Sequence, residues 1–584
     1  MSCVWIRRWK YKTINNIRTR VVKSRLCVRG FLDPQKTGLS RHSSTASRIS
    51  QRLALSIATN NNYAVESWDI SSAFLQGFSF STLSQCAAQL GMDIRGLQRE
   101  AYICFSDNVW CHLRTANMPN CPPVGSNLSQ YCAQLLKPMY GLIDAPLLWQ
   151  LCLRHFIVTT LHGRPSIYDD NFYSWRTNDN DNSNNNNNKP KHKPLVAVLT
   201  AHVDDTLACA SQSTLDWLRK SLEDRFGEMK RQTLPFSHVG LTIERVPTGL
   251  FVHQSEFCKS LQPFKLTAER ARQVTERCTP QETTALRSGL GGSMYLAQTR
   301  PDIAVELVTM MTIVNEATVN DIKQMNTLIN RAKHTPDRGL MIMKVQSPYR
   351  LLVISDASHA SSKTVYAKEG QITLLTSDES ASRLPSRPSI LTGDQLHDLL
   401  CGPTQLLFYS SKKSARVSHS TSHAESLGSH GALATAELIS ARYTELYSPV
   451  TMTLDAMIQH DQKLPHEIPI DLVGDAKDVL ELVTGERGVP LDTAQRVIIL
   501  SLRERRLLRK LRCMYTISTF DMIANRLTKY DAKDTSLDNF LQTGSLCIKH
   551  PGFFRPAAAT KQNFSEQDLI NHREEYLTIS QISS

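Results

Sequence analysis

Two adjacent carboxylates, Asp204 and Asp205, lie within an apolar run that extends from Pro194 to Ala210. The β-branched and alternating apolar residues of this run, PLVAVLTAHVDDTLACA, predict buried β-strands. Burying an unpaired charge is costly, so two carboxylates at this place require cations or a sharp turn. We therefore expect two apolar strands joined by a tight turn on which both aspartates lie.

A third carboxylate, Asp69, lies near the end of the strand that we predict from Ala64 to Ile70. Carboxylates on neighbouring strands repel one another unless divalent cations bridge them. Carboxylate Mg²⁺ sites at strand ends are a common arrangement for nucleotide polymerisation. From the residues alone, a polar hairpin tip without a metal is the alternative.

The second half of the chain contains another set of three carboxylates. Asp356 ends a predicted strand, Glu425 lies beside the apolar stripe of a predicted helix, and Asp475 lies at a predicted strand-to-helix turn. Apolar neighbours on the helix favour an inward position for Glu425. The alternative for Glu425 is an ordinary surface position on its helix.

The net charge of +13 is concentrated in two clusters of basic residues. Clusters of this kind suit a polyanion such as nucleic acid, and a solvated surface is the alternative for each of them. The first cluster consists of Arg7, Arg8, Lys10, Lys12, Arg18, Arg20, Lys23, Arg25 and Arg29, and the second of Arg503, Arg505, Arg506, Arg509, Lys510 and Arg512.

A chain of 584 residues is too long for one hydrophobic core, so we expect several domains. No apolar run approaches the length of a membrane span, and no membrane partner is expected. The 14 cysteines include no CxxC pair, which suits reduced intracellular thiols. The low-complexity segment from Asn178 to Lys193 predicts an exposed loop between strands.

Several motifs, in chain order, resemble the reverse transcriptase and ribonuclease H of copia-type (Pseudoviridae-like) LTR retrotransposon Pol polyproteins. The reverse transcriptase resemblance rests on KSRLCVRGF, WDISSAFLQG, LLKPMYGLIDAPLLW, TAHVDDTLA and GLGGSMYLAQTRPDIA. The ribonuclease H resemblance rests on SDAS, FYSSKKSARVSHSTSHAES, LVGDAKD and ANRLTK. Together they span the chain from about Trp5 to Lys529.

The resemblance implies a multidomain fold of the α+β and α/β classes: a right-hand polymerase followed by a ribonuclease H-like mixed sheet. The expected boundaries are fingers and palm at 1–260, with the low-complexity loop at 178–193, and thumb or connection at 261–345. The ribonuclease H-like domain is expected at 346–530 and a C-terminal tail at 531–584.

The resemblance also implies an RNA-directed DNA polymerase, a nucleotidyltransferase, whose ribonuclease H degrades RNA in RNA–DNA hybrids. Two Mg²⁺ or Mn²⁺ ions per active site would be the cofactors. The expected partners are an RNA template, a DNA primer or RNA–DNA hybrid, dNTPs and other retroelement proteins such as Gag and integrase. The expected location is a cytoplasmic virus-like particle, with the nucleus as a second site. A catalytically decayed remnant that only binds nucleic acid is the alternative.

Carried over position by position, the resemblance makes Asp69, Asp204 and Asp205 the polymerase metal ligands. Phe74 would lie beneath the incoming sugar and exclude a ribose 2′-hydroxyl, unless it simply fills the core. Basic side chains of the fingers would bind the triphosphate, unless they form a solvated strand face, and the loop from Tyr140 to Pro146 would position the template. These basic residues are Lys23 and Arg25. The ribonuclease H carboxylates and metal ligands would be Asp356, Glu425 and Asp475.

Four departures from the family pattern bear on activity. His202 replaces an aromatic residue near the primer end, and Asp144 places an acid near the template and nucleotide, where many members have Gln. Asn525 occupies the place of the fourth ribonuclease H carboxylate, where it could still ligate a cation with less charge. The segment LDTAQRVIILSLRE lacks the histidines common in the family. These substitutions threaten the ribonuclease H activity more than the polymerase.

Overall fold

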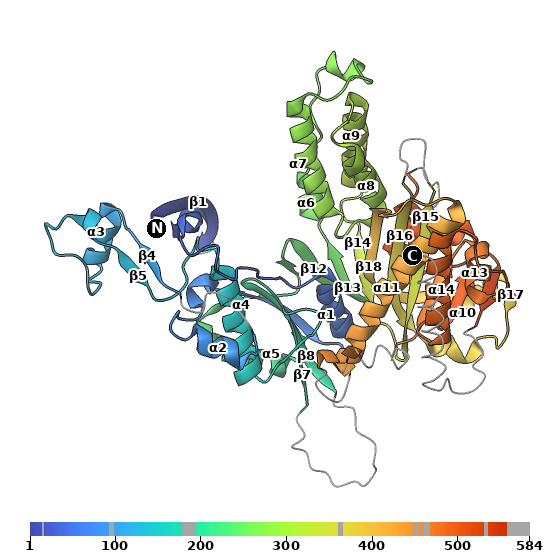
Figure 1. Cartoon of the computed structure of the whole chain (residues 1–584), viewed down its shortest axis with the longest axis horizontal. Helices are drawn as coiled ribbons and strands as arrows, with labels where there is room; N and C mark the ends of the chain where they lie inside the picture. The colour runs from blue at the N-terminus through green and yellow to red at the C-terminus, as the bar shows by residue number, and fades with distance from the viewer. Residues whose placement is uncertain are drawn as a thin grey trace, which may run out of the picture. The chain divides into compact units, whose positions relative to one another are not determined.

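The computed structural model describes residues 1–14, 17–92, 99–177, 194–359, 366–447, 453–455, 457–458, 468–530 and 535–556. The chain divides into two compact units, which are described one at a time (Figure 1). Unit 1 comprises Met1–Ala58 and Asn62–Val239, and unit 2 comprises Thr59–Asn61 and Gly240–Ser584. Both units mix helices and sheets, as the sequence predicts. The low-complexity segment 178–193 lies outside the described residues.

A six-stranded antiparallel sheet forms the centre of unit 1. The strand predicted over Ala64–Ile70 is β3, and the predicted turn joins β8 to β9. In sheet order the strands are β10 (Met229–Thr233), β3 (Ala64–Ile70), β9 (Asp205–Ala210), β8 (Leu195–His202), β7 (Phe172–Arg176) and β6 (Arg164–Pro165).

Helices pack against this sheet through a continuous apolar core. Trp149 of α4 meets Phe226 of α5 edge to face, with ring centroids 5.2 Å apart, and α5 contacts β3, β8 and β9. The helices of this part of the chain are α1 (Arg48–Asn60), α2 (Leu83–Gln89), α3 (Asp107–Thr115), α4 (Ala145–His155) and α5 (Gln212–Phe226).

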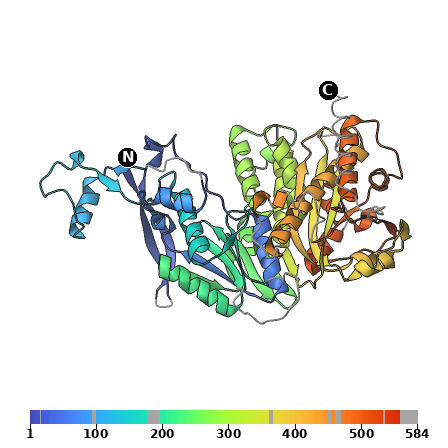
Figure 2. The same cartoon turned by 60° about the horizontal axis from the view of Figure 1, so that its bottom comes forward.

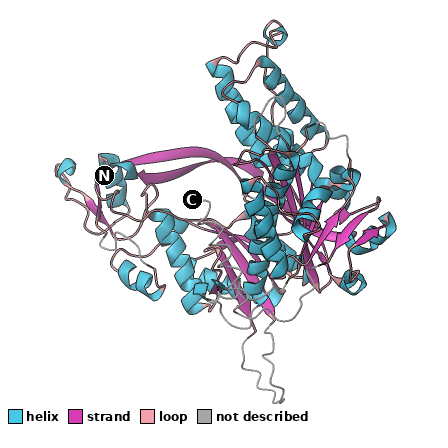
Figure 3. Cartoon of the chain, turned by 45° about the vertical axis from the view of Figure 1, so that its right-hand side comes forward, coloured by secondary structure: helices cyan, strands magenta, loops and turns pink. Residues whose placement is uncertain are grey.

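The first two strands of unit 1, β1 (Cys3–Ile14) and β2 (Ile17–Val28), pair only with each other in a long antiparallel hairpin. Figure 3 shows this hairpin as a ribbon that begins near the N-terminus. A smaller pair is formed by β4 (Ala101–Ile103) and β5 (Ala133–Leu135), and β11 (Phe236–His238) ends the unit.

The large sheet of unit 2 is mixed, because β19 pairs in parallel with both β15 and β20. A final strand, β21 (Ser545–Leu546), pairs with β18 off the main path. In sheet order its strands are β12 (Leu241–Val246), β13 (Gly249–His253), β14 (Gly339–Met343), β18 (Gly402–Lys413), β16 (Lys368–Ser377), β15 (Tyr349–Ser358), β19 (Ile470–Gly474), β20 (Cys513–Thr516), β22 (Gly552–Arg555) and β17 (Ser389–Leu391).

The long helix α11 (Thr421–Tyr447) lies across this sheet over β15 and β16 (Figure 2). Three helices, α7, α8 and α9, form a separate apolar cluster before it. No helix among the described residues is long and apolar enough to cross a membrane. The other helices of unit 2 are α6 (Ser255–Ser260), α7 (Pro280–Leu296), α8 (Ala304–Ile313), α9 (Val319–His334), α10 (Gly393–Leu400), α13 (Lys477–Thr484), α14 (Thr493–Leu507) and α15 (Ser536–Thr543).

Two expectations differ from this fold. Asp356 lies inside β15, opposite Gly370 of β16, because the strand continues to Ser358 instead of ending at the carboxylate. The segment expected as a tail contributes α15 and β22, and β22 pairs with β20 and β17. The apolar residues Phe540 and Phe554 are buried there, which explains why this segment joins the folded unit.

A buried ion-pair network ties β19 to the residue before β20. The carboxylate of Asp471 is fully buried and accepts hydrogen bonds from Arg512 at 2.9 and 2.6 Å and from Arg350 at 3.4 Å. Arg512 also donates to both oxygens of Asp378, at 2.7 and 2.8 Å. Four charges satisfy one another away from water, so removing Asp471 takes a buried partner from both Arg350 and Arg512, although Arg512 keeps its bonds to Asp378.

We therefore expect Asp471→Ala to lower the free energy of unfolding by about 3–5 kcal/mol, because two buried guanidinium groups lose their partner. The measurement is urea-induced unfolding followed by circular dichroism. The matched control is Asp398→Ala, whose side chain is 69% exposed. Equal midpoints for the two variants would contradict a structural role for the network.

Candidate metal centres at two acidic clusters

The first acidic cluster is built by the turn between β8 and β9 together with the end of β3. The turn bends through Val203, whose φ of 62° lies in the left-handed region and whose carbonyl accepts the indole N–H of Trp149 at 2.7 Å. Asp205 lies opposite Asp69 in the β3–β9 register, and the Asp204 carbonyl accepts the backbone N–H of Ile70 at 3.0 Å. The three predicted carboxylates are therefore brought together.

These carboxylates repel one another. Burial, followed by the charges of Asp204 and Asp69, raises the pKa of Asp205 to about 6, against the opposing effect of Lys230. No choice of one oxygen from each of these three carboxylates brings all three oxygens within 4.8 Å of one another. In the second cluster, described below, one oxygen from each carboxylate lies within 4.8 Å of the other two. The concentration of negative charge fits a divalent cation, and these residues would hold it.

Of the two predicted fingers residues, Lys23 lies close to this cluster and Arg25 lies beside the predicted template loop. Burial, Arg25 and Lys10 lower the pKa of Lys23, while Asp69 and Asp204 oppose them, so Lys23 lies within electrostatic reach of the carboxylates. The Arg25 guanidinium lies 5.2 Å from the centre of the Tyr140 ring. Both basic side chains are exposed, as a ligand-binding role requires.

Phe74, half-buried on a short helical turn, meets the ring of Tyr140 edge to face at 5.8 Å. Tyr140 begins the predicted template loop, and its carbonyl accepts the Val28 N–H at 2.7 Å. Gly141 has a φ of 94°, and a Cβ there would lie 2.0 Å from the Val28 carbonyl oxygen, so only glycine fits. The loop is thereby fixed against β2.

Asp144 differs from the expectation. Its side chain is buried and accepts a hydrogen bond from Nε of Arg99 at 2.9 Å, and Arg99 also pairs with Asp33. The acid expected near template and nucleotide therefore balances a buried guanidinium. Sequence reasoning missed this partner because Arg99 lies 45 residues away in the chain.

His202 is half-buried, and its Nδ1 atom has no hydrogen-bond partner among the described residues. Burial lowers the pKa of this imidazole, and Asp204 opposes the shift. The ring is therefore neutral near pH 7. It preserves a flat, uncharged surface next to the acidic turn.

The second acidic cluster brings together Asp356 of β15, Glu425 of α11 and Asp475 after β19, with one carboxylate oxygen of each within 4.8 Å of the others. Glu425 accepts the Ala357 N–H at 3.0 Å, so it points toward β15 and is not a surface residue. Burial, then Asp356 and Asp475, raises the pKa of Glu425 well above its ordinary value. This charge density also fits a divalent cation held by the three residues.

A cation from the chain itself lies beside this cluster. Nζ of Lys529 lies 3.3 Å from Oδ1 of Asp356 and donates to Oδ1 of Asn525 at 2.7 Å. Thr528 donates to the other oxygen of Asp356. Asn525 thus binds the lysine and, through its amide nitrogen, the Thr519 carbonyl at 2.7 Å.

Lys529 and Thr528 have contacts that the sequence analysis missed, although both belong to the quoted motif ANRLTK. The available signal was the spacing of four residues between Asn525 and Lys529, which places two side chains on one side of a helical turn.

The two basic clusters differ in the exposure and the contacts of their side chains. On the β1–β2 hairpin, Arg7, Arg8 and Lys10 are exposed beside the exposed ring of Trp9, whose partner in a cation–π contact is Arg20 at 4.3 Å. In the second cluster most members bind the protein itself, so a solvated or polyanion-binding surface is the wrong expectation for them. These members are Arg503 (Leu482 and Arg487 carbonyls), Arg505 (Glu437), Arg506 (Thr484 and Pro556 carbonyls) and Arg512 (Asp471 and Asp378).

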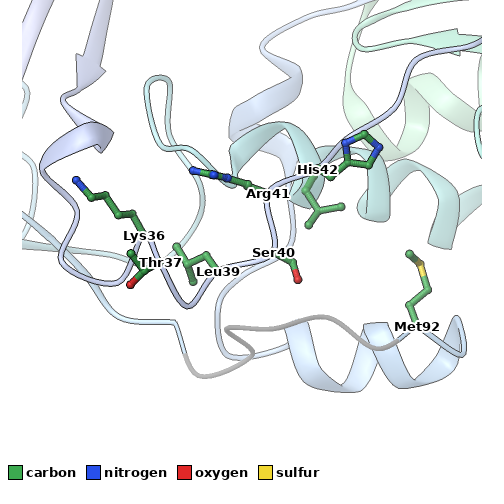
Figure 4. A pocket seen from close by; sticks show the side chains of 8 residues that line it. Lys36, Thr37, Leu39, Ser40, Arg41, His42 and Met92 are labelled. Atoms are coloured by element: carbon green, nitrogen blue, oxygen red, sulfur yellow. The ribbon is translucent and has the colours of Figure 1, made fainter.

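A hollow of about 590 Å³ in unit 1 was not foreseen (Figure 4). The segment from Lys36 to His42 supplies three basic side chains to its lining, and Met92 faces them from another segment. The only signal in the sequence is the spacing of Lys36, Arg41 and His42 in a segment with one glycine and one proline nearby.

Asp205→Asn should stabilise the metal-free protein, because it removes one of the repelling charges. Since the pKa is raised from 3.8 to about 6, the gain is full above about pH 6 and vanishes below pH 4. Solvent screening at this half-buried site limits the gain to about 1 kcal/mol. The measurement is thermal unfolding in EDTA across this pH range. The control is exposed Asp224→Asn, and a pH-independent difference would contradict the repulsion.

No protein-family model matches the chain. Solved structures with some likeness to this chain include the following two. A foamy viral protease–reverse transcriptase in complex with RNA/DNA hybrid has 11% identity and a TM-score of 0.36, covering 83% of this chain and 47% of that one. The N-terminal RNase H domain of rv2228c from Mycobacterium tuberculosis, fused to maltose binding protein, has 14% identity and a TM-score of 0.17, covering 32% of this chain and 97% of that one.

Two curated relatives from Arabidopsis thaliana match in sequence. The retrovirus-related Pol polyprotein from transposon RE1 is 25% identical over 385 residues, and that from transposon RE2 is 24% identical over 387 residues. The chain spans only 22% of the length of each relative. Over 63% of its own length the chain is similar to these copia-type Pol polyproteins, which confirms the resemblance that its motifs indicate.

Proposed function

We propose that the chain is an RNA-directed DNA polymerase of a copia-type retroelement, with a second centre that cleaves RNA in RNA–DNA hybrids. One observation supports this above all: residues far apart in sequence form two separate acidic clusters, each next to basic side chains. A single metal-dependent transferase would account for only one of these clusters.

At each cluster a pair of Mg²⁺ or Mn²⁺ ions would activate the attacking oxygen, a primer hydroxyl in unit 1 and water in unit 2, and offset charge at phosphorus. In unit 1, Asp69, Asp204 and Asp205 would hold the ions, while Lys23 and Arg25 bind the triphosphate. Phe74 is braced by Tyr140, so its ring could limit space beside the sugar.

In this proposal unit 1 supplies the fingers and palm of a right-hand polymerase. The helices α7 to α9 act as thumb or connection, and the sheet around β15 is the ribonuclease H-like domain. The exposed β1–β2 hairpin contacts the template–primer duplex through alternating cations and aromatic rings. The same proposal places the activity of the chain in a cytoplasmic virus-like particle or in the nucleus.

Primer extension on an RNA template with Mg²⁺ tests the polymerase. We expect the parent chain to add dNTPs and Asp205→Asn to lose at least about 100-fold of the rate, because a metal ligand is removed. The control is Asp224→Asn, an exposed acid on α5. Synthesis by Asp205→Asn at the parent rate would refute the metal assignment, and no synthesis by the parent would favour a remnant that only binds nucleic acid.

For the hybrid-cleaving centre, the contact between Lys529 and Asn525 favours a remnant that binds nucleic acid without cleaving it. The reason is that the ammonium group of Lys529 occupies part of the acidic cluster. We expect Asn525→Asp together with Lys529→Met to lower the Mg²⁺ concentration for half-maximal hybrid cleavage by about tenfold, since one charge is gained and one competitor is lost.

The single variant Asn525→Asp should give a smaller effect, because the new carboxylate pairs with Lys529. Mg²⁺ affinity from calorimetry is measured beside cleavage to separate binding from turnover. An unchanged Mg²⁺ requirement in the double variant would show that position 525 is not a ligand.

A further inference from the structure

Besides the two acidic clusters, a third group of side chains that could ligate a metal lies at the start of α11. One ligand atom each of His419, His423 and Asp492 lies within 4.8 Å of the other two. Nδ1 of His419 and Oδ2 of Asp492 are 2.5 Å apart, and Nδ1 of His423 lies 4.0 Å from Oδ1 of Asp492. None of these residues has a role in the proposed function.

The ligands are held on a scaffold that is already assembled. Asp492 caps α14 by accepting the Gln495 N–H at 2.8 Å. The Gln495 amide donates to Ser422 at 2.9 Å and to Ser426 at 3.3 Å, both on α11. The two helix starts are therefore joined before any ion arrives, which lowers the ordering cost of binding one.

The two imidazoles differ in exposure, one buried and one open to solvent. The His423 side chain is 2% exposed, and its Nδ1 atom, which lies nearest Asp492, accepts the backbone N–H of His419 at 3.4 Å, a bond that an ion would replace. The His419 side chain is 62% exposed, so an ion has a path from solvent. Two imidazoles and one carboxylate are a donor set typical of Zn²⁺, with a fourth position left for water.

We propose that His419, His423 and Asp492 bind Zn²⁺, which clamps the segment before α11 to the start of α14. The ion replaces the proton that joins His419 to Asp492, and that proton passes to solvent. The two imidazole nitrogens and one carboxylate oxygen then shift by about 1 Å to reach zinc–ligand distances near 2.0–2.2 Å. Glu425 follows His423 by two residues on α11, so the clamp also fixes the entry of Glu425 into the acidic cluster.

The test uses the full chain, freed of metal by dialysis against a chelator, with Zn²⁺ and Co²⁺ as probes. We expect about one high-affinity Zn²⁺ per chain, a rise in the unfolding temperature on its addition, and the visible absorption of four-coordinate Co²⁺ without a thiolate band. His419→Ala and Asp492→Asn should each abolish the Co²⁺ absorption and the rise. Asparagine still caps α14, so Asp492→Asn should keep its fold.

The control Asp475→Asn alters the neighbouring acidic cluster and should retain the Co²⁺ absorption. Circular dichroism verifies that each variant is folded. The proposal is overturned if the parent shows no four-coordinate Co²⁺, if His419→Ala binds Co²⁺ like the parent, or if Asp475→Asn alone abolishes the signal. Because the readout is metal binding, the result is independent of whether the chain polymerises DNA.

Discussion

Repulsion between carboxylates on neighbouring strands is the constraint on which both units depend. In unit 1, Asp69 and Asp205 face each other across β3 and β9, and half-exposure lets water and Lys230 soften the repulsion. In unit 2, Asp356 is fully buried on a central strand, where water cannot help. The second cluster therefore needs a positive charge from within the chain when no divalent ion is bound.

Lys529 supplies that charge, and its position opposes the binding of a metal ion at the cluster. An ammonium 3.3 Å from Asp356 stabilises the buried carboxylate but competes with any cation that Asp356 would ligate. A fourth carboxylate at position 525 would have shifted this balance toward a metal. With Asn525 there, the amide oxygen is bound to the lysine instead. Stability without metal and affinity for metal thus oppose each other at one pair of side chains.

Local patterns predicted what depends on local spacing. The strand predicted over AVESWDI has the bounds of β3, and the amphipathic helix predicted over Ser213–Phe226 matches α5 to within one residue. The turn between β8 and β9 followed from the cost of burying two carboxylates in a strand, and the structure has Asp204 on that turn and Asp205 as the first residue of β9. The sequence could not reveal that Arg99 pairs with Asp144, or that Asp492 meets His419 from 73 residues away, because such contacts depend on tertiary packing.

The density of basic residues in the sequence did not predict which of the two clusters is exposed in the fold. The β1–β2 hairpin is a two-stranded sheet, and among its described residues Arg7, Arg8 and Lys10 are exposed. The second cluster is denser in basic residues, yet α14, where it begins, packs against α11 and α13, whose acids and carbonyls accept hydrogen bonds from Arg505 and Arg503. The packing around a basic segment, rather than the number of its arginines, therefore decides whether its cations stay exposed to solvent.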